Sequence, residues 1–380
     1  MVIAFALLTL AAFAARFVLA WFSTGTNDAG TWLRFANRIT SHGLFNAYFS
    51  LPSLNHPPLP ALWSAAALKV AQLTGAQFEF IFKLPAILAD AIACRILYLV
   101  FSHRRAPRAG WAAAAGYAWC PVAILVSAYH CNTDNIYAML CLLAAYLLWR
   151  GRPFASGLSL AAAINVKLIP VLLVPALLSL CRTRREALRF ILGVSAGVIP
   201  FIPVLIAVGP QFARNALAYN SLANRWGIGF FLYEMYNQPR FRTFAYGAMR
   251  FYFENGRWVI LAAVALLSYF SWRRRAWDAY EAGAMTLAIF LILAPGFGLQ
   301  YTVAIAPLLV AACRTVGSLY GLLAGLMLFL AYLATWTGEV PLASFFDGPW
   351  PMPGPLFGLI AWWVLMGYLI RVLRRAAARR

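Results

Sequence analysis

Three side chains that can exchange protons lie in one stretch of the chain, residues 23–60, directly after the first hydrophobic run. They are Asp28, His42 and His56. Asp28 stands where an amphipathic run begins, so it is either a residue that caps the following helix or a carboxylate that acts as a general base. His56 opens a proline-rich run that fixes an extended backbone before a second predicted helix. It is either an interface residue or a substrate contact.

A second polar turn, with His130, Asn132 and Asp134, follows the third hydrophobic run. Its imidazole and carboxylate either contact a sugar, bind a metal or cap the next helix. Together with Asp28, the residues His130 and Asp134 are the candidate ligands for a divalent ion such as Mg²⁺ or Mn²⁺. Their spacing matches no defined zinc site, so a metal is a candidate cofactor and not a requirement.

Four cations are candidates for binding a phosphate group. Lys167 lies within a long hydrophobic segment, where a cation is costly unless it meets an anion. Arg16 lies in the first hydrophobic run, and Arg214 and Arg225 lie in a later aromatic segment; guanidinium groups bind phosphate well. Lys167 and Arg16 alternatively extend their charged ends to the membrane interface.

Asp90 and Lys83 lie on one face of the second hydrophobic run, seven residues apart. We expect either a structural contact between them inside the bundle or a pairing of each with another helix.

The composition predicts an all-α, polytopic membrane protein. Hydrophobic residues make up 63% of the 380 residues and charged residues 11%, and hydrophobic runs of about 20 residues recur from end to end, as a bilayer requires. The net charge of +20 collects in short arginine runs between these segments. Such runs are typical of cytoplasmic loops and not of a nucleic-acid-binding face. The six cysteines show no C-x-x-C spacing, so neither a zinc site nor disulfides are indicated.

The arginine runs also predict a topology. We expect one membrane domain over residues 1–380, with about 12 membrane helices and both termini cytoplasmic, in the cell membrane. Two segments then face outside: residues 23–77, with amphipathic juxtamembrane helices, and residues 209–257, rich in aromatic and basic residues. Residues 153–181 have arginines at both ends, and a straight helix of this length would measure about 42 Å, longer than the ~30 Å bilayer core. We therefore expect a hairpin of two short helices with its break near Asn165–Lys167.

In this order, the polar motifs resemble the GT-C superfamily of membrane glycosyltransferases. The resemblance covers most of the chain, although each motif alone is weakly specific. It rests on Asp28 after the first span, Asn55-His56-Pro57-Pro58-Leu59, the turn from His130 to Asp134, Asn165-Val166-Lys167-Leu168-Ile169-Pro170, Tyr219-Asn220-Ser221 with Trp226-Gly227, and the run from Pro295 to Tyr301. Where protein O-mannosyltransferases carry an adjacent Asp-Glu pair, this chain has Asn27 and Asp28.

The resemblance implies an inverting transfer of a hexose, mannose by similarity, from a polyprenyl-phosphate carrier to a lipid, glycan or protein acceptor on the extracytoplasmic face. Asp28 would be the general base and Lys167 the leading ligand of the carrier phosphate, helped by the arginines named above. Substrate contacts would come from His56, His130, Asn132, Asp134, Tyr219, Trp226, Gln300 and Tyr301.

Two other functions fit the sequence. A transporter or a flippase for lipid-linked sugars suits 12 spans and a lysine at membrane depth, but we see no internal repeat, and the acidic residues gather outside the membrane. A non-enzymatic partner in envelope assembly is the third interpretation. We expect the glycosyltransferase, with Asp28 as the residue that decides between them.

Overall fold

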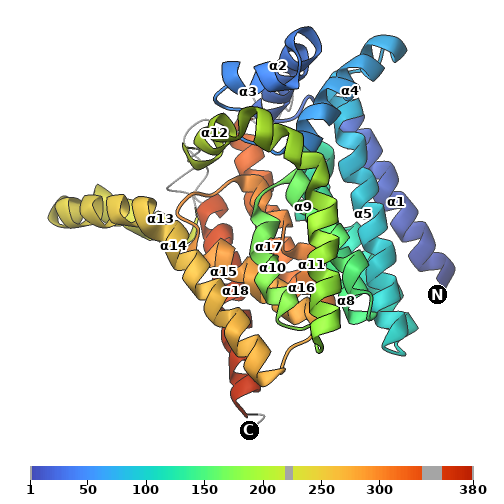
Figure 1. Ribbon diagram of the computed structural model, residues 1–380, viewed down its shortest axis with the longest axis vertical. Helices are drawn as coiled ribbons and strands as arrows, with labels where there is room; N and C mark the ends of the chain where they lie inside the picture. Colours follow the sequence, from blue (N-terminus) through green and yellow to red (C-terminus); the bar gives the residue numbers. More distant parts are fainter. Residues whose placement is uncertain (1, 219–225, 336–352, 379–380) are drawn as a thin grey trace. The chain divides into compact units, whose positions relative to one another are not determined.

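The computed structural model describes residues 2–218, 226–335 and 353–378, and every regular element in these ranges is helical (Figure 1). Five helices are long and apolar enough to cross a membrane: Ile3–Phe22, Phe78–His103, Arg184–Leu217, Arg314–Leu333 and Gly354–Ala378. A sixth span results if the bent pair Pro107–Ala118 and Pro121–His130 is counted as one. The predicted all-α membrane fold is thus confirmed. The described residues show five or six spans in place of the expected 12, because several apolar runs form helices of only 10–17 residues.

The chain divides into two compact units, which we describe separately. Unit 1 contains Met1–Val171 and Cys181–Tyr219, and unit 2 contains Leu172–Leu180 and Asn220–Arg380. The helices of unit 1 are α1 (Val2–Phe22), α2 (Asn27–His42), α3 (Leu44–Ser50), α4 (Pro58–Thr74), α5 (Phe78–His103), α6 (Pro107–Ala118), α7 (Pro121–Ile124), the π-helical turn η1 (Leu125–His130), α8 (Asp134–Trp149), α9 (Pro153–Val166), α11 (Arg184–Val198), η3 (Ile199–Phe201) and α12 (Ile202–Ala218).

Unit 2 begins with the short segment around α10 (Leu173–Leu178) and continues after residue 225. Its other helices are α13 (Gly227–Asn237), η4 (Pro239–Phe241), α14 (Arg242–Arg274), α15 (Ala279–Leu293), η5 (Leu299–Val303), α16 (Ala306–Ala312), α17 (Arg314–Thr335) and α18 (Pro353–Ala378). In α14, the end of the predicted outer segment and the predicted span from Trp258 to Trp272 form one continuous helix of 33 residues.

The segment after α1 folds as three short helices, and α2 is amphipathic as predicted. Its buried positions recur every three or four residues, which places them on one face of the helix. They are Ala29, Trp32, Phe35, Ala36 and Ile39. The ring of Trp32 lies 5.0 Å from that of Phe82 on α5, so this buried face anchors α2 beside a membrane-spanning helix.

The predicted break in the 153–181 segment is confirmed. Helix α9 ends at Val166, and Lys167 is extended, with φ −155° and ψ 148°. A short 3₁₀ helix, η2 (Ile169–Leu172), precedes α10. The backbone is therefore irregular at Lys167, which in a membrane is tolerated where surrounding protein satisfies the freed polar groups.

Buried polar contacts tie the helices of unit 1 together. Asp90 on α5 forms an ion pair with Arg16 on α1, with 3.2 Å between Oδ2 and Nε. Its other oxygen accepts hydrogen bonds from Tyr117 on α6 and Asn135 on α8. Lys83 instead donates to the carbonyl oxygen of Ser23 at the end of α1. Of the two expectations for Asp90 and Lys83, the pairing of each with another helix is the one observed.

Candidate functional site

The polar residues at the start of α2 are held against the turn that precedes α8. Thr26 caps α2, because its hydroxyl accepts a hydrogen bond from the Asp28 amide at 3.3 Å and donates one to the His130 carbonyl at 2.9 Å. Gly25, with φ +101°, lies so close that a Cβ atom there would stand 2.7 Å from the Tyr129 carbonyl oxygen. A glycine is required by this contact and by the positive φ. Asp28 is therefore not the cap, and its side chain is available for other contacts.

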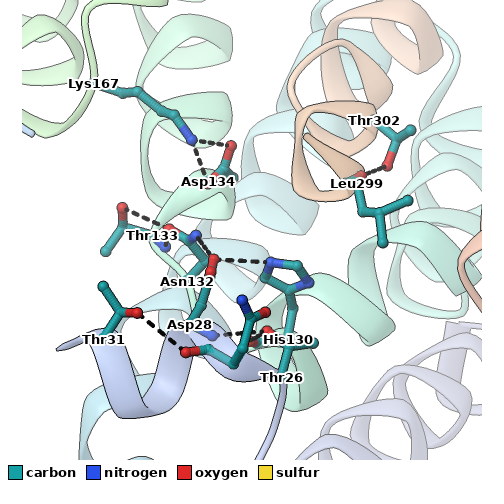
Figure 2. Close-up of polar contacts among 11 residues, drawn as sticks. Thr26, Asp28, Thr31, His130, Asn132, Thr133, Asp134, Lys167, Leu299 and Thr302 are labelled. Atoms are coloured by element: carbon teal, nitrogen blue, oxygen red, sulfur yellow. Dashed lines mark hydrogen bonds and ion pairs between the residues drawn. The ribbon is translucent and has the colours of Figure 1, made fainter. Parts of the chain in front are cut away.

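Asp28 forms a hydrogen-bonded cluster with the 130–132 turn (Figure 2). Its Oδ2 atom accepts hydrogen bonds from His130 Nε2 at 3.1 Å and from Asn132 Nδ2 at 2.5 Å. His130 and Asn132 are buried, whereas the Asp28 side chain keeps 28% of its surface exposed. The cluster therefore presents one carboxylate whose orientation is fixed by two donors.

Asp134, at the start of α8, forms a bidentate ion pair with Lys167 (Figure 2). Lys167 Nζ lies 2.9 Å from each carboxylate oxygen, and Asp134 is fully buried. The ammonium group also lies 5.8 Å from the centre of the Tyr137 ring. Lys167 therefore meets an anion from its own chain, and a ligand phosphate would have to compete with Asp134 for it.

His56 belongs to the same region of unit 1. Its ring packs 4.7 Å from that of Trp32, and its carbonyl accepts a hydrogen bond from the Tyr48 hydroxyl. Burial, with help from the nearby positive charge of Lys167, lowers the pKa of His56 to about 3, although the charge of Asp28 opposes this shift. His56 is therefore neutral at physiological pH.

Asp28 is ionised in the same environment. Burial raises the pKa of its carboxyl group, but the hydrogen bond and charge of His130, the hydrogen bond from Asn132 and the charge of Lys167 together lower it below its usual range. With Asp134 neutralised by Lys167, Asp28 supplies the negative charge on the open side of the cluster.

The remaining cations predicted to bind phosphate lie elsewhere or outside the described residues. Arg16 is fully buried in α1 and bound to Asp90, and it also donates to the carbonyl oxygens of Ala12 and Ala118. Arg214 is exposed on α12. Arg225 lies outside the described residues.

Three of the predicted substrate contacts, Trp226, Gln300 and Tyr301, lie in unit 2. Trp226 is stacked on Phe297 with 4.6 Å between ring centres, and its indole nitrogen donates to the Leu291 carbonyl. Tyr301 meets the edge of the same Phe297 ring, and Gln300 is buried beside it in the sequence. These side chains therefore form part of the core of unit 2. Tyr219 lies outside the described residues.

Metal binding gains no support from the geometry. In the described part of the chain, no group of three or more His, Cys, Asp or Glu side chains is arranged to hold a metal ion. Of the proposed ligands, Asp28 contacts His130, whereas Asp134 is engaged by Lys167.

The sequence interpretation missed two residues that build the site. Gly25 and Thr26 place Asp28, and a threonine two residues before the first acid of an amphipathic run is a recognisable cap signal. The contact of Gly25 with Tyr129 and Cys131 has no sequence signal, because it joins segments about a hundred residues apart.

Comparison with known proteins identifies the family. The family model described as GPI transamidase subunit PIG-U matches residues 10–299, which is more than half of the chain. The chain belongs to the PIG-U family. It is accordingly a multi-pass membrane protein, in agreement with its apolar helices. No protein with a curated description matches it.

Membership in the PIG-U family corrects the functional expectation. The predicted polyprenyl-phosphate-dependent mannosyltransferase, its transporter or flippase alternative and the polyprenyl-linked sugar donor as partner are wrong, because the family is that of a transamidase subunit. The name of the matched family does not confirm the resemblance to the GT-C superfamily. The motifs behind this resemblance are short polar turns between apolar helices. Many membrane proteins have polar turns at these places, so the turns do not specify a reaction.

Proposed function

We propose that the chain is a membrane subunit of a GPI-transamidase-type assembly, and that it binds the hydroxyl-rich head of a glycolipid without transferring a group itself. The subunit role rests on the PIG-U family match over residues 10–299. The ligand-binding role rests on one observation: Asp28 is oriented by His130 and Asn132, yet part of its side chain is exposed.

The chemistry of the cluster favours a hydroxyl-rich ligand. An ionised carboxylate accepts hydrogen bonds only, and an exposed carboxylate oxygen suits the hydroxyl donors of a sugar or an inositol. The amide of Asn132 and the imidazole of His130 hold this acceptor in place, so little conformational entropy is lost when the ligand binds. The charge of Lys167, which is paired with Asp134, also helps to keep Asp28 ionised.

The proposal includes the sidedness predicted from the arginine runs. The polar cluster would lie on the side of the membrane opposite to the arginine-rich turns, and the short helices α2, α3 and α4 would lie along that face. The membrane would be the one in which the partner subunits assemble. The lipid tails of the ligand would enter between apolar helices, and its head would meet Asp28.

Binding of a short-chain glycosylphosphatidylinositol to the purified full-length protein tests the ligand role. We expect Asp28→Asn to weaken binding about 10- to 100-fold, since a hydrogen bond to a charged group contributes about 1.5–3 kcal/mol. Glu254→Gln is the matched control, because it removes an exposed carboxylate from α14 in unit 2 and should leave binding unchanged. Equal affinity of wild type and Asp28→Asn would exclude the cluster as the binding site.

Co-purification with the other subunits of the assembly tests the subunit role separately. Asp28→Asn should retain its partners, because the change affects ligand contact and not assembly. A wild-type chain that binds the glycolipid but recruits no partner would contradict the subunit role alone.

A further inference from the structure

A helical hairpin in unit 2 presents aromatic and basic side chains to its surroundings. Helix α13 packs against the first part of α14, and the 3₁₀ turn Pro239–Phe241 joins them (Figure 1). We call residues 227–258 the arm. The site described above lies in unit 1, whereas the arm belongs to unit 2.

The arm has one packed face and one exposed aromatic row on α14. Ala245 and Gly256 are buried, and a Cβ atom at Gly256 would stand 3.0 Å from the Pro295 ring. Phe244, Phe251 and Trp258 follow one another at intervals of seven residues, which keeps them on one side of the helix. Their exposed fractions are 66%, 67% and 59%.

A basic row lies next to the aromatic row. Arg250 and Arg257 are exposed and also seven residues apart, each one residue before an aromatic residue of the row and therefore about 100° around the helix. Arg240 and Arg242 add positive charge at the tip of the hairpin. The exposed acids of the arm are Glu234 and Glu254, and Glu254 is paired with Arg250 at 2.9 Å. Four arginines against two glutamates leave the arm positively charged.

We propose that the arm lies in the headgroup layer of a bilayer that contains anionic lipid, with the aromatic row at the acyl boundary and the basic row on lipid phosphates. Aromatic rings prefer this layer, and clustered arginines are attracted to anionic headgroups. The exposed large residues of α1 include Ile3, Leu7 and Leu10, as expected of a helix facing lipid tails. The aromatic composition of the arm points instead to the interface.

A protein partner fits these side chains less well. The core of a protein interface is depleted of charge, whereas here arginines accompany the aromatic row along the length of the arm. The charge complementarity is with an anionic surface, and it is continuous from the tip of the hairpin to Arg257.

A fluorescent probe on the arm tests the proposal in the full-length protein. Phe251→Cys is labelled with a polarity-sensitive fluorophore, and the wild type serves as the labelling blank because five native cysteines are buried and Cys313 is half-buried. We expect a blue shift in nanodiscs of phosphatidylcholine with phosphatidylglycerol, and stronger quenching by lipids spin-labelled near the headgroup than by lipids labelled in mid-chain. In pure phosphatidylcholine the shift should be smaller, and high salt should reduce the difference. The same label at Phe244→Cys should give the same pattern.

Two double variants test whether the dependence on anionic lipid comes from the basic row or from positive charge anywhere on α14. Arg250→Gln with Arg257→Gln should remove the dependence on phosphatidylglycerol. Arg273→Gln with Arg274→Gln removes the same charge from the exposed C-terminal end of α14 and should leave that dependence unchanged. A probe that reports water in both lipid mixtures overturns the proposal, and equal shifts in both mixtures overturn the anionic preference. A probe that becomes shielded only when a second protein is added would assign the arm to a protein interface instead.

Discussion

Gly25 and Thr26 set the position of Asp28. Thr26 takes the capping role and bonds to the His130 carbonyl, and Gly25 lets the chain approach the 129–131 turn closely. The carboxylate is thereby free to meet His130 and Asn132. A residue type that is good at capping helices is therefore used here for a contact between distant segments.

Gly25→Ala should destabilise unit 1. The new Cβ atom would lie 2.7 Å from the Tyr129 carbonyl oxygen and 2.9 Å from Cys131 Cβ, at a backbone φ of +101°. The positive φ and the overpacking together predict a loss of about 2–4 kcal/mol, measured as a lower thermal unfolding temperature in detergent. Gly30→Ala is the control, because nothing lies within 4 Å of its added Cβ and an alanine inside a helix gains about 0.5–1 kcal/mol. Equal effects of the two changes would contradict the close approach.

His56 should make the stability depend on pH. Its folded-state pKa of about 3 lies below the ordinary value of 6.5, so between these values the unfolded chain binds a proton that the folded chain rejects. The contribution to stability is then complete above pH 6.5 and decreases as the pH falls towards 3. His56→Gln should remove this component. We expect the unfolding temperature of the wild type, relative to that of the variant, to rise from pH 4 to 6.5 and then stay level. A difference that does not change with pH would show that His56 is accessible to protons in the folded state.

The sequence predicted which turns carry polar groups, but not all of their pairings. Asp28 and the turn from His130 to Asp134 are both expected outside the membrane, but a shared side does not predict the hydrogen bonds that Asp28 accepts from His130 and Asn132. The sequence indicates no partner for Lys167, because Asp134 lies 33 residues away from it in the chain. Arg16 and Asp90 were both identified as charges inside spans, yet their pairing depends on the packing of α1 against α5, which no spacing within one helix encodes.

At the scale of elements, glycines set the contact between α9 and α11. A Cβ atom at Gly157 would collide with the Phe190 carbonyl, and one at Gly193 would collide with the Phe154 carbonyl. The two backbones therefore touch, as in small-residue packing between membrane helices. This contact holds α9 in place up to the residue before Lys167.

Gly193→Ala should separate α9 from α11 and cost about 1–3 kcal/mol. Because α9 leads to Lys167, we also expect weaker protection from hydrogen exchange at the amide of Lys167, which donates to the Ala163 carbonyl. Gly116→Ala on α6 is the matched control, since nothing lies within 4 Å of its added Cβ. If Gly193→Ala leaves both the unfolding temperature and the exchange unchanged, the close helix contact is wrong.

The buried Arg16–Asp90 pair joins several elements and should be costly to break from one side. Asp90→Leu leaves the Arg16 guanidinium buried without its carboxylate, at a cost of about 3–5 kcal/mol. Replacing both charges, Arg16→Met with Asp90→Leu, should cost less than the single change, because no unpaired charge remains. Unfolding temperatures of Arg16→Met, Asp90→Leu and the double variant test this coupling. Additive effects would mean that the pair contributes no mutual interaction.

The number of spans was overestimated for reasons that lie in the elements. Each apolar run predicts a span, but Pro121 and Lys167 interrupt two of these runs, and several others form helices of only 10–17 residues. The predicted outer segment and the predicted span after it form one helix, α14, which is not among the candidate spans of the described residues. Hydropathy shows that a segment is apolar, whereas helix ends depend on local contacts at single residues.

At the scale of the whole molecule, the charge distribution predicts which ends of the helices share a side of the membrane. Helix α5 has 26 residues and is therefore about 39 Å long, more than the ~30 Å bilayer core. We therefore predict that the segment before it, which includes α2, α3 and α4, lies on the side opposite to the turn that joins α5 and α6. That turn carries the arginine run expected of a cytoplasmic loop.

Cysteine labelling in intact cells tests this sidedness. Ser53→Cys, exposed between α3 and α4, should react with a membrane-impermeant maleimide added outside. Arg108→Cys, exposed at the start of α6, should react only after the membrane is permeabilised. The wild type measures background labelling. If both positions react from the same side, α5 does not cross the bilayer. If the pattern is reversed, the polar cluster with Asp28 faces the cytoplasm, and a ligand presented on the opposite face could not reach it.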